Sequence, residues 1–236
     1  MKNKTWRFDT CKAINMMDFE KVENAILWLK ICKKKGKKVF VFGNGGGAGT
    51  HFAADLFKMS GMKAICLNDN IPLVSALTND DGWENVYIEQ LKRLVEKDDI
   101  IIVFSVHGGK GKDKAGKWSE NLTKAVVYAK KRSAKVISIV GFDKGILKKI
   151  SDICIHIPAD STPIVESIQN LVHHIIAFEL NEGKRKWQVR KTKREERECV
   201  VIENEKIYPM EHVGKIAFSS IGTCYFHSSS LLYKRI

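Results

Sequence analysis

The chain has 236 residues, of which 44% are hydrophobic, and a formal net charge of +13. This length can bury one sizeable core with an appendage, and the absence of any run of eighteen apolar residues argues against a membrane-spanning helix. The six cysteines are scattered without a Cys-x-x-Cys pair, which excludes a disulfide framework or a cysteine zinc site.

The N-terminus, Met1-Lys2-Asn3-Lys4, lacks the apolar core of a secretion signal, so we expect a cytoplasmic protein. The positive charge is concentrated after residue 182, which leaves the body of the chain only moderately basic. Such a body suits an anionic metabolite, and it does not require nucleic acid or a membrane surface as a partner.

The pattern in chain order begins with a helical apolar stripe over residues 18–35, with Gly36 as its expected C-cap. A short buried strand follows at residues 39–42, and it ends in a loop with five glycines between Gly43 and Gly49. A helix is predicted to restart near Thr50. Free N–H groups of such a loop, followed by a helix N-terminus, form a typical phosphate site.

The sequence of this loop can be compared with two nucleotide-binding motifs. No Gly-Lys-Ser/Thr sequence closes it, which excludes a Walker P-loop, whereas Gly43, Gly45 and Ala48 fit a loose dinucleotide fingerprint. Asp69 lies about twenty residues further on, but it falls in a turn after the second strand. The dinucleotide match is therefore weak.

Strand and helix patterns then alternate along the chain. Strands are predicted at residues 63–67, 99–105, 135–140 and 153–157, and helices at residues 83–97, 119–132, 144–150 and 164–180. An apolar segment covers residues 71–77, and residues 78–82 are expected to form a polar loop. This alternation predicts a doubly wound, five-stranded parallel α/β sheet with an N-terminal helix.

Ligands of such sheets bind at the carboxyl ends of the strands. The loops to consider are therefore residues 43–50, 68–70 and 105–119. The first of these is followed by His51 and Asp55, which lie four residues apart on one helix face, and the last helix carries Glu166 and His174 two turns apart. Two imidazoles and two carboxylates suit zinc or a similar divalent ion. His173 points about 100° away from His174 and is interpreted as structural.

The sequence Gly43-Asn44-Gly45-Gly46, followed by His51-Phe52-Ala53-Ala54-Asp55-Leu56, resembles the phosphoheptose isomerase branch of the SIS (sugar isomerase) family. Later segments agree with this resemblance, namely Ala76 to Asp80, Val140 to Asp143, and Ile164 to His174. The resemblance covers residues 18–182. It predicts a SIS domain over residues 1–182 and leaves residues 183–236 as a basic extension of unknown role, in which residues 199–202 and 206–208 could form a small hairpin.

The resemblance implies an aldose/ketose isomerase that interconverts sedoheptulose 7-phosphate and D-glycero-D-manno-heptose 7-phosphate for surface-polysaccharide heptose. It also implies a homotetramer with sites between subunits, zinc in the site, and proton transfer through an enediol. Carried over to this chain, it makes Asp55 and His174 catalytic, and it makes His51, Asp55, Glu166 and His174 metal ligands. The substrate-binding residues that it implies lie mainly in the loops: Asn44, Gly45, Gly46, Asn79, Asp80, Ser105, Val106, His107, Ser119 and Glu166.

Several positions depart from the family pattern. Asp55 stands where the family has glutamate, and Glu166 stands where it has glutamine. The second phosphate loop has lost hydroxyl groups and carries an insertion rich in lysine at residues 110–118. Two alternatives therefore stay open: a non-catalytic SIS module that binds a sugar phosphate or a protein partner in replication or transcription control, and an isomerase of another sugar phosphate.

Overall fold

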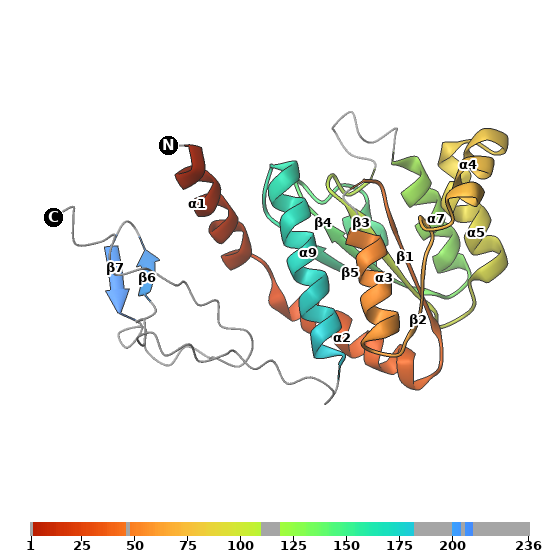
Figure 1. Cartoon of the computed structure of the whole chain (residues 1–236), viewed down its shortest axis with the longest axis horizontal. Coiled ribbons are helices and arrows are strands. Elements are labelled where there is room, and N and C mark those ends of the chain that lie inside the picture. Colours follow the sequence, from red (N-terminus) through yellow and green to blue (C-terminus); the bar gives the residue numbers. More distant parts are fainter. Residues whose placement is uncertain (1, 46–47, 110–118, 182–199, 204–205, 210–236) are drawn as a thin grey trace. The chain divides into compact units, whose positions relative to one another are not determined.

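The computed structural model describes residues 2–45, 48–109, 119–181, 200–203 and 206–209. The chain falls into two compact units, residues 1–185 and 186–236, and this division lies close to the boundary predicted after residue 182. Most elements of the first unit are labelled in Figure 1. Within the described residues, no helix is both long and apolar enough to cross a bilayer.

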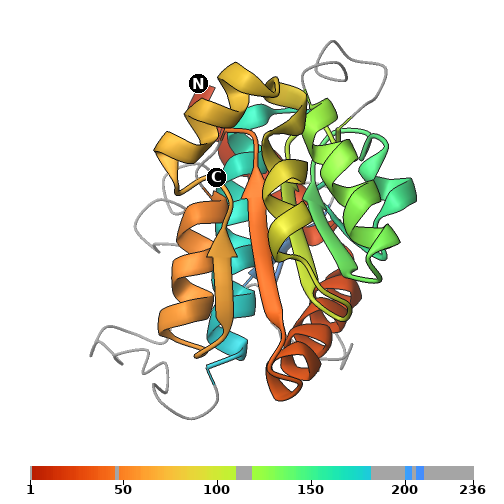
Figure 2. The ribbon, with the colours of Figure 1, turned by 90° about the vertical axis from the view of Figure 1, so that its right-hand side faces the viewer.

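A five-stranded sheet with the strand order β2-β1-β3-β4-β5 forms the centre of the first unit (Figure 2). Every neighbouring pair of strands is parallel. The strands are β1 (Lys38–Gly43), β2 (Lys63–Cys66), β3 (Ile100–Ser105), β4 (Lys135–Val140) and β5 (Ile153–His156). The predicted fold, a doubly wound five-stranded parallel sheet, is confirmed.

Helices cover both faces of this sheet, as Figures 1 and 2 show. One face packs against α2 (Phe19–Lys34), α3 (Ala48–Lys58) and α9 (Thr162–Glu179). The other face carries the remaining helical elements that follow the second strand: α4 (Ile71–Asp80), the 3₁₀ turn η1 (Trp83–Asn85), α5 (Val86–Leu94), α7 (Glu120–Lys131) and α8 (Leu147–Ile150).

The alternation of side chains along each strand separates two cores. In β1, Val39 and Val41 belong to the core under α2, α3 and α9, whereas Phe40 and Phe42 belong to the core under α5 and α7. Both sets are fully buried. This is why the strands read as continuous apolar runs in the sequence, since a parallel sheet covered on both faces exposes neither set.

The structure differs from the sequence-based prediction at residues 78–82. Thr78, Asn79 and Asp80 do not form a loop, because they are the last residues of α4. The Asn70 side chain caps the start of this helix by accepting from the Leu73 N–H, and the Thr78 hydroxyl bonds back to the Val74 carbonyl. These bonds satisfy the polar groups inside the helix, whose composition alone is typical of a turn.

A helix that was not predicted, α1 (Lys2–Asn15), precedes α2. Its sequence is only weakly amphipathic, so no helical stripe marks it. Ala13 and, just beyond the helix, Met17 are nevertheless buried in the core that contains α9. Tertiary packing of these few apolar residues, and not a periodic pattern, positions the segment.

The second unit contains a short antiparallel hairpin, β6 (Val200–Glu203) with β7 (Lys206–Pro209). In its register Val201 lies opposite Tyr208, and Ile202 lies opposite Ile207. The small hairpin predicted for this stretch is therefore confirmed.

Candidate active site

The strand order places the topological switch point between β1 and β3. The chain leaves β1 toward β2 on one side and leaves β3 toward β4 on the other, so the loops after β1 and β3 meet at the carboxyl edge of the sheet. Gly43 ends β1 there. A Cβ atom at this position would lie 2.7 Å from the Phe104 carbonyl oxygen of β3, so only glycine allows the two strands to close up.

A network of amide and hydroxyl groups holds the start of the glycine-rich loop. The Asn44 and Asn121 side chains exchange two hydrogen bonds of 2.9 Å, and the Tyr87 hydroxyl donates to the Gly43 carbonyl at 2.8 Å. Asn68, which follows β2, donates to the same carbonyl at 3.0 Å. The loop after β1 is thus connected to the segments after β2 and to α7.

Asn121 and Tyr87 are functional candidates that sequence reasoning missed. Asn121 is fully buried although it is polar, and besides its bonds to Asn44 its carboxamide oxygen accepts from the Leu122 N–H at 2.9 Å. Burial raises the pKa of Tyr87 to about 12, so its hydroxyl stays protonated and can donate. Asn68 lies in a loop that the fold prediction had singled out, whereas nothing in the pattern around Asn121 marks it.

A double-mutant cycle tests this network. We expect Asn44→Ala and Asn121→Ala each to lower the free energy of unfolding by about 1–3 kcal/mol, because each leaves a partner amide without its hydrogen bonds. The double variant should lose less than the sum of the two, since both remove the same pair. Urea unfolding gives the free energy of unfolding of the two single variants and the double variant. Strictly additive losses would contradict the pair of hydrogen bonds between Asn44 and Asn121.

Beyond the glycine-rich loop, four side chains of types that can bind a metal converge. His51 and Asp55 lie one turn apart on α3, and His173 and His174 are consecutive residues on α9. One ligand atom from each residue can be chosen so that all lie within 4.8 Å of one another. The Asp55 Oδ2 atom is 3.6, 3.8 and 3.7 Å from the Nε2 atoms of His51, His173 and His174, respectively.

These distances suit a shared metal ion. Bonds of about 2.0–2.2 Å to one tetrahedral ion place its ligand atoms roughly 3.4 Å apart, close to the spacing around Asp55. Three imidazoles and a carboxylate are also ligands typical of zinc. His51 and His174 are partly exposed, with 55% and 40% of their side-chain surfaces accessible, so the group opens on one side.

His173 gives the strongest evidence that something belongs between these side chains. It is fully buried, and neither ring nitrogen has a hydrogen-bond partner among the described residues. A buried imidazole without partners is costly. Burial, together with the neighbouring His174 and His51, lowers the pKa of His173 to about 3, so the ring is neutral and its nitrogens can bind a metal. The residues present therefore fit a bound divalent ion.

The lowered pKa of His173 predicts acid sensitivity. An unfolded histidine titrates near about 6.5. Between that pH and about 3 the unfolded state binds a proton at this residue and the folded state does not, so the free energy of unfolding decreases as the pH falls through this window. We expect His173→Leu to remove part of that decrease. Urea unfolding of both metal-free proteins across the window tests it, and an identical pH dependence would contradict it.

The structure brings together three of the four predicted metal ligands, His51, Asp55 and His174, and it adds His173, which was interpreted as structural. Glu166 is not part of the group. It precedes His174 by eight residues on α9, which corresponds to about 12 Å along the helix axis. In this structure the Glu166 carboxylate is therefore outside the four-residue group.

The other predicted site residues divide between the loops and the end of α4. Asn44 and Gly45 follow β1, and Gly46 lies outside the described residues. Asn79 and Asp80 are at the exposed end of α4, where their side chains bond to each other at 2.8 Å. They are not part of the histidine–aspartate group.

The segment after β3 packs closely on its surroundings. The buried Ser105 hydroxyl accepts from the Gly109 N–H at 3.2 Å, the Val106 carbonyl accepts from the Gly141 N–H, and the His107 ring packs on Phe142 at 4.3 Å. Ser119 precedes α7, but its side chain makes no capping bond, and the Leu122 N–H bonds to the Ser119 carbonyl. The insertion at residues 110–118 lies outside the described residues.

Comparison with known proteins places this arrangement in a family. The model of the SIS domain matches residues 8–141, which is more than half of the chain. The chain belongs to the SIS domain family. Within it, the phosphoheptose isomerase of Helicobacter pylori (strain ATCC 700392 / 26695) is 35% identical over 146 residues, a match that covers 59% of this chain and 71% of that enzyme.

Two further relatives define the position of this SIS protein. The lincomycin biosynthesis protein LmbN of Streptomyces lincolnensis is 42% identical over 146 residues, which cover 57% of this chain and 52% of LmbN, so the chain spans about half of that relative. The structure of a phosphoheptose isomerase from Francisella tularensis superposes with a TM-score of 0.67 at 25% identity, and the match covers 76% of this chain and 95% of that one. The predicted membership of the phosphoheptose isomerase branch, a branch of sugar-phosphate isomerases, is confirmed.

Proposed function

We propose that this SIS protein is a metal-dependent isomerase that interconverts sedoheptulose 7-phosphate and D-glycero-D-manno-heptose 7-phosphate. One observation carries the proposal. Four side chains converge, namely His51, Asp55, His173 and His174. The first of them, His51, lies in the first turn of α3, directly after the glycine-rich loop at the switch point of the sheet. A module that only binds a partner has no need of four convergent metal ligands behind a phosphate loop.

The phosphate end of the sugar is assigned to the two loops at the switch point. Backbone N–H groups at the start of α3 face the space after β1, where a helix N-terminus stabilises an anion. Asn44 is fixed by Asn121 and Tyr87, so the backbone of the loop is pre-organised before the ligand arrives. Ser105 and the turn to Gly109 form the opposite wall.

The reacting end of the sugar is assigned to the histidine–aspartate group. Isomerisation of a ketose to an aldose moves one proton between adjacent carbons through an enediol, and a second proton between the two oxygens. Asp55 is the candidate base, because its carboxylate is only 15% exposed and faces all three imidazoles. His174 lies on the open side of the group, where it can exchange a proton with a sugar hydroxyl.

A divalent metal, with zinc as the first candidate, would be held by His51, Asp55, His173 and His174. When bound, it supplies a Lewis acid that polarises the sugar carbonyl. Asp55 is one methylene shorter than the glutamate that the family has at this position. His173 belongs to the same group of side chains and would add an imidazole ligand. The family resemblance further supports a homotetramer in the cytoplasm with sites between subunits, in which Glu166 of one copy could contact a neighbour's substrate.

Purified protein incubated with sedoheptulose 7-phosphate, with and without zinc, tests the proposal by NMR detection of the aldose. We expect turnover that requires the metal. Folded protein that produces no aldose in either condition would overturn the assignment of sedoheptulose 7-phosphate as the substrate.

An isomerase of another sugar phosphate is the second candidate. The identity to LmbN, 42%, exceeds the 35% identity to the Helicobacter pylori enzyme, and the loop after β3 has lost hydroxyl groups that the family resemblance would supply. The same assay with fructose 6-phosphate as the ketose separates the two. Turnover of fructose 6-phosphate alone would replace the seven-carbon substrate while keeping the reaction class.

A further inference from the structure

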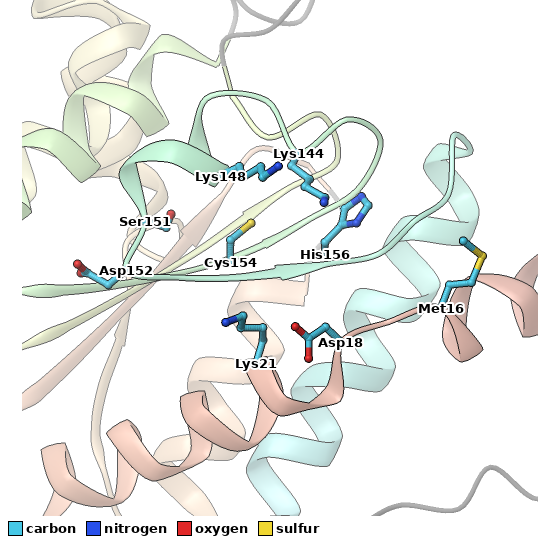
Figure 3. A pocket seen from close by; sticks show the side chains of 9 residues that line it. All are labelled: Met16, Asp18, Lys21, Lys144, Lys148, Ser151, Asp152, Cys154 and His156. Carbon is cyan, nitrogen blue, oxygen red and sulfur yellow. The ribbon is translucent and has the colours of Figure 1, made fainter.

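A basic cavity lies along the free edge of the sheet, apart from the histidine–aspartate group. β5 is an edge strand, paired only with β4 among the described strands. A cavity of about 400 Å³ surrounds its exposed side (Figure 3). This volume lies in the range of small-molecule sites. None of the residues assigned to the proposed reaction lines it.

Three lysines from separate elements reach this cavity. Lys144 comes from the loop after β4, Lys148 from α8, and Lys21 from α2. None of the three makes an ion pair or a side-chain hydrogen bond with a described residue, although several other lysines of the protein do. Figure 3 shows the ammonium group of Lys144 beside the His156 ring of β5, with the Lys148 side chain extended toward Lys144.

The acidic groups at the cavity are already engaged. Asp152 accepts from the Lys130 ammonium at 2.8 Å and from the Val136 N–H at 2.8 Å. Asp18 accepts from the Glu20 N–H at the start of α2, where the helix dipole offsets its charge. With Asp152 paired to Lys130, the lining holds three lysines against the single carboxylate of Asp18, so the cavity keeps a net positive charge.

His156 adds a hydrogen-bond acceptor to these donors. Its Nε2 atom lies 2.7 Å from the Phe142 carbonyl oxygen, which can only accept, so Nε2 carries the proton and Nδ1 has a free lone pair. Burial, and then the charges of Lys144 and Lys148, lower the pKa of His156 and keep the ring neutral. Ammonium donors beside an imidazole acceptor match an anion that also carries a hydroxyl group.

The backbone that presents Lys144 is held in a fixed, strained conformation. Lys144 has a φ of 73°, in the region that favours glycine, and Phe142 before it has a φ of 43°. Gly108 packs so closely on this loop that a Cβ atom there would lie 1.9 Å from the Lys144 carbonyl oxygen. Strain of this kind is maintained only where the surrounding structure fixes the segment, and it is concentrated at functional sites.

We infer that this cavity is a second anion site, which binds inorganic phosphate or a small phosphate monoester between Lys144 and Lys148. The inference does not depend on the proposed isomerase reaction. A dianionic phosphate group would accept charge-assisted hydrogen bonds from the ammonium groups, and a hydroxyl of a monoester would donate to His156.

Cys154 provides a reporter inside the cavity. Its thiol is partly exposed and lines the site, whereas Cys11 on α1 is also partly exposed and does not line it. Alkylation of each cysteine by iodoacetamide can be followed by peptide mass spectrometry in phosphate or in chloride of matched ionic strength. At a phosphate concentration about ten times the dissociation constant, we expect Cys154 to react about tenfold more slowly and Cys11 to be unaffected.

Variants distinguish this site from general effects. We expect Lys144→Gln combined with Lys148→Gln to raise the phosphate concentration needed for protection at least about tenfold, because two charged donors are lost. Lys149→Gln is the matched control, since Lys149 is on the same helix but lines a different groove. Circular dichroism checks the fold of each protein, and the single Lys148→Gln variant repeats the test if the double variant is unfolded.

Two results would overturn the inference. One is alkylation of Cys154 that phosphate does not slow, as expected if phosphate binds only at the glycine-rich loop. The other is protection that Lys149→Gln weakens as much as the double variant does, which would indicate a diffuse charge effect. Loss of isomerase activity in any of these variants has no bearing on either outcome.

Discussion

Asp55→Asn is expected to lower the rate of sugar-phosphate isomerisation about 10²–10⁴-fold, the range that a positioned acid or base contributes. The substitution keeps the size of the side chain but removes its charge and its basicity, at the atom that faces His51, His173 and His174. The rate of aldose formation, measured by NMR with zinc present, gives the effect on turnover.

The matched control is Asp9→Asn, because Asp9 is an exposed carboxylate on α1 that belongs neither to the histidine–aspartate group nor to the implied substrate-binding residues. Binding of the sugar phosphate, measured by calorimetry, should be largely retained in Asp55→Asn, since the loops at the switch point are unchanged. Activity that persists in Asp55→Asn would show that Asp55 is not the base.

His51→Ala is expected to weaken zinc binding by at least about 100-fold, because even residues that only orient metal ligands change affinity by 10–100-fold. The free protein should keep its fold, since His51 is more than half exposed and contributes little to the core. Competition with a chelator of known affinity gives the dissociation constant of each variant.

Glu166→Ala is the informative comparison for this experiment. Within one subunit Glu166 is two turns of α9 away from His174, so we expect its removal to leave zinc affinity unchanged. A loss as large as that of His51→Ala would contradict the four-residue group described above and would return Glu166 to the ligand set, supplied by another copy.

The sequence was sufficient to predict the sheet because each strand is an uninterrupted apolar run. Residues 100–104, for example, are all buried, and both faces of β3 are covered by helices. The end of α4 was missed, because Thr78, Asn79 and Asp80 have the composition of a turn while their hydrogen bonds are those of a helix. α1 was missed because few of its residues are buried, so its pattern carries no period.

Part of the site was predictable from the spacing of residues along one helix. His51 and Asp55 are four residues apart, a spacing that places two side chains on one helix face in any helix. The position of His173 beside Asp55 could not be predicted, because consecutive residues point about 100° apart and a sequence does not show how α9 is rotated against α3. In the structure α3 approaches α9 so that both His173 and His174 face Asp55. The Asn44–Asn121 pair joins residues 77 positions apart, which no local pattern reveals.

Exchange of carbon-bound hydrogen in D₂O tests the central claim most directly, because it detects proton transfer through an enediol even when little aldose accumulates. We expect zinc-loaded protein to incorporate deuterium at C1 of sedoheptulose 7-phosphate, and Asp55→Asn to slow this incorporation in parallel with turnover. Folded, zinc-loaded protein that binds the sugar phosphate but leaves C1 free of deuterium and forms no aldose would contradict the assignment of this site as an isomerase centre.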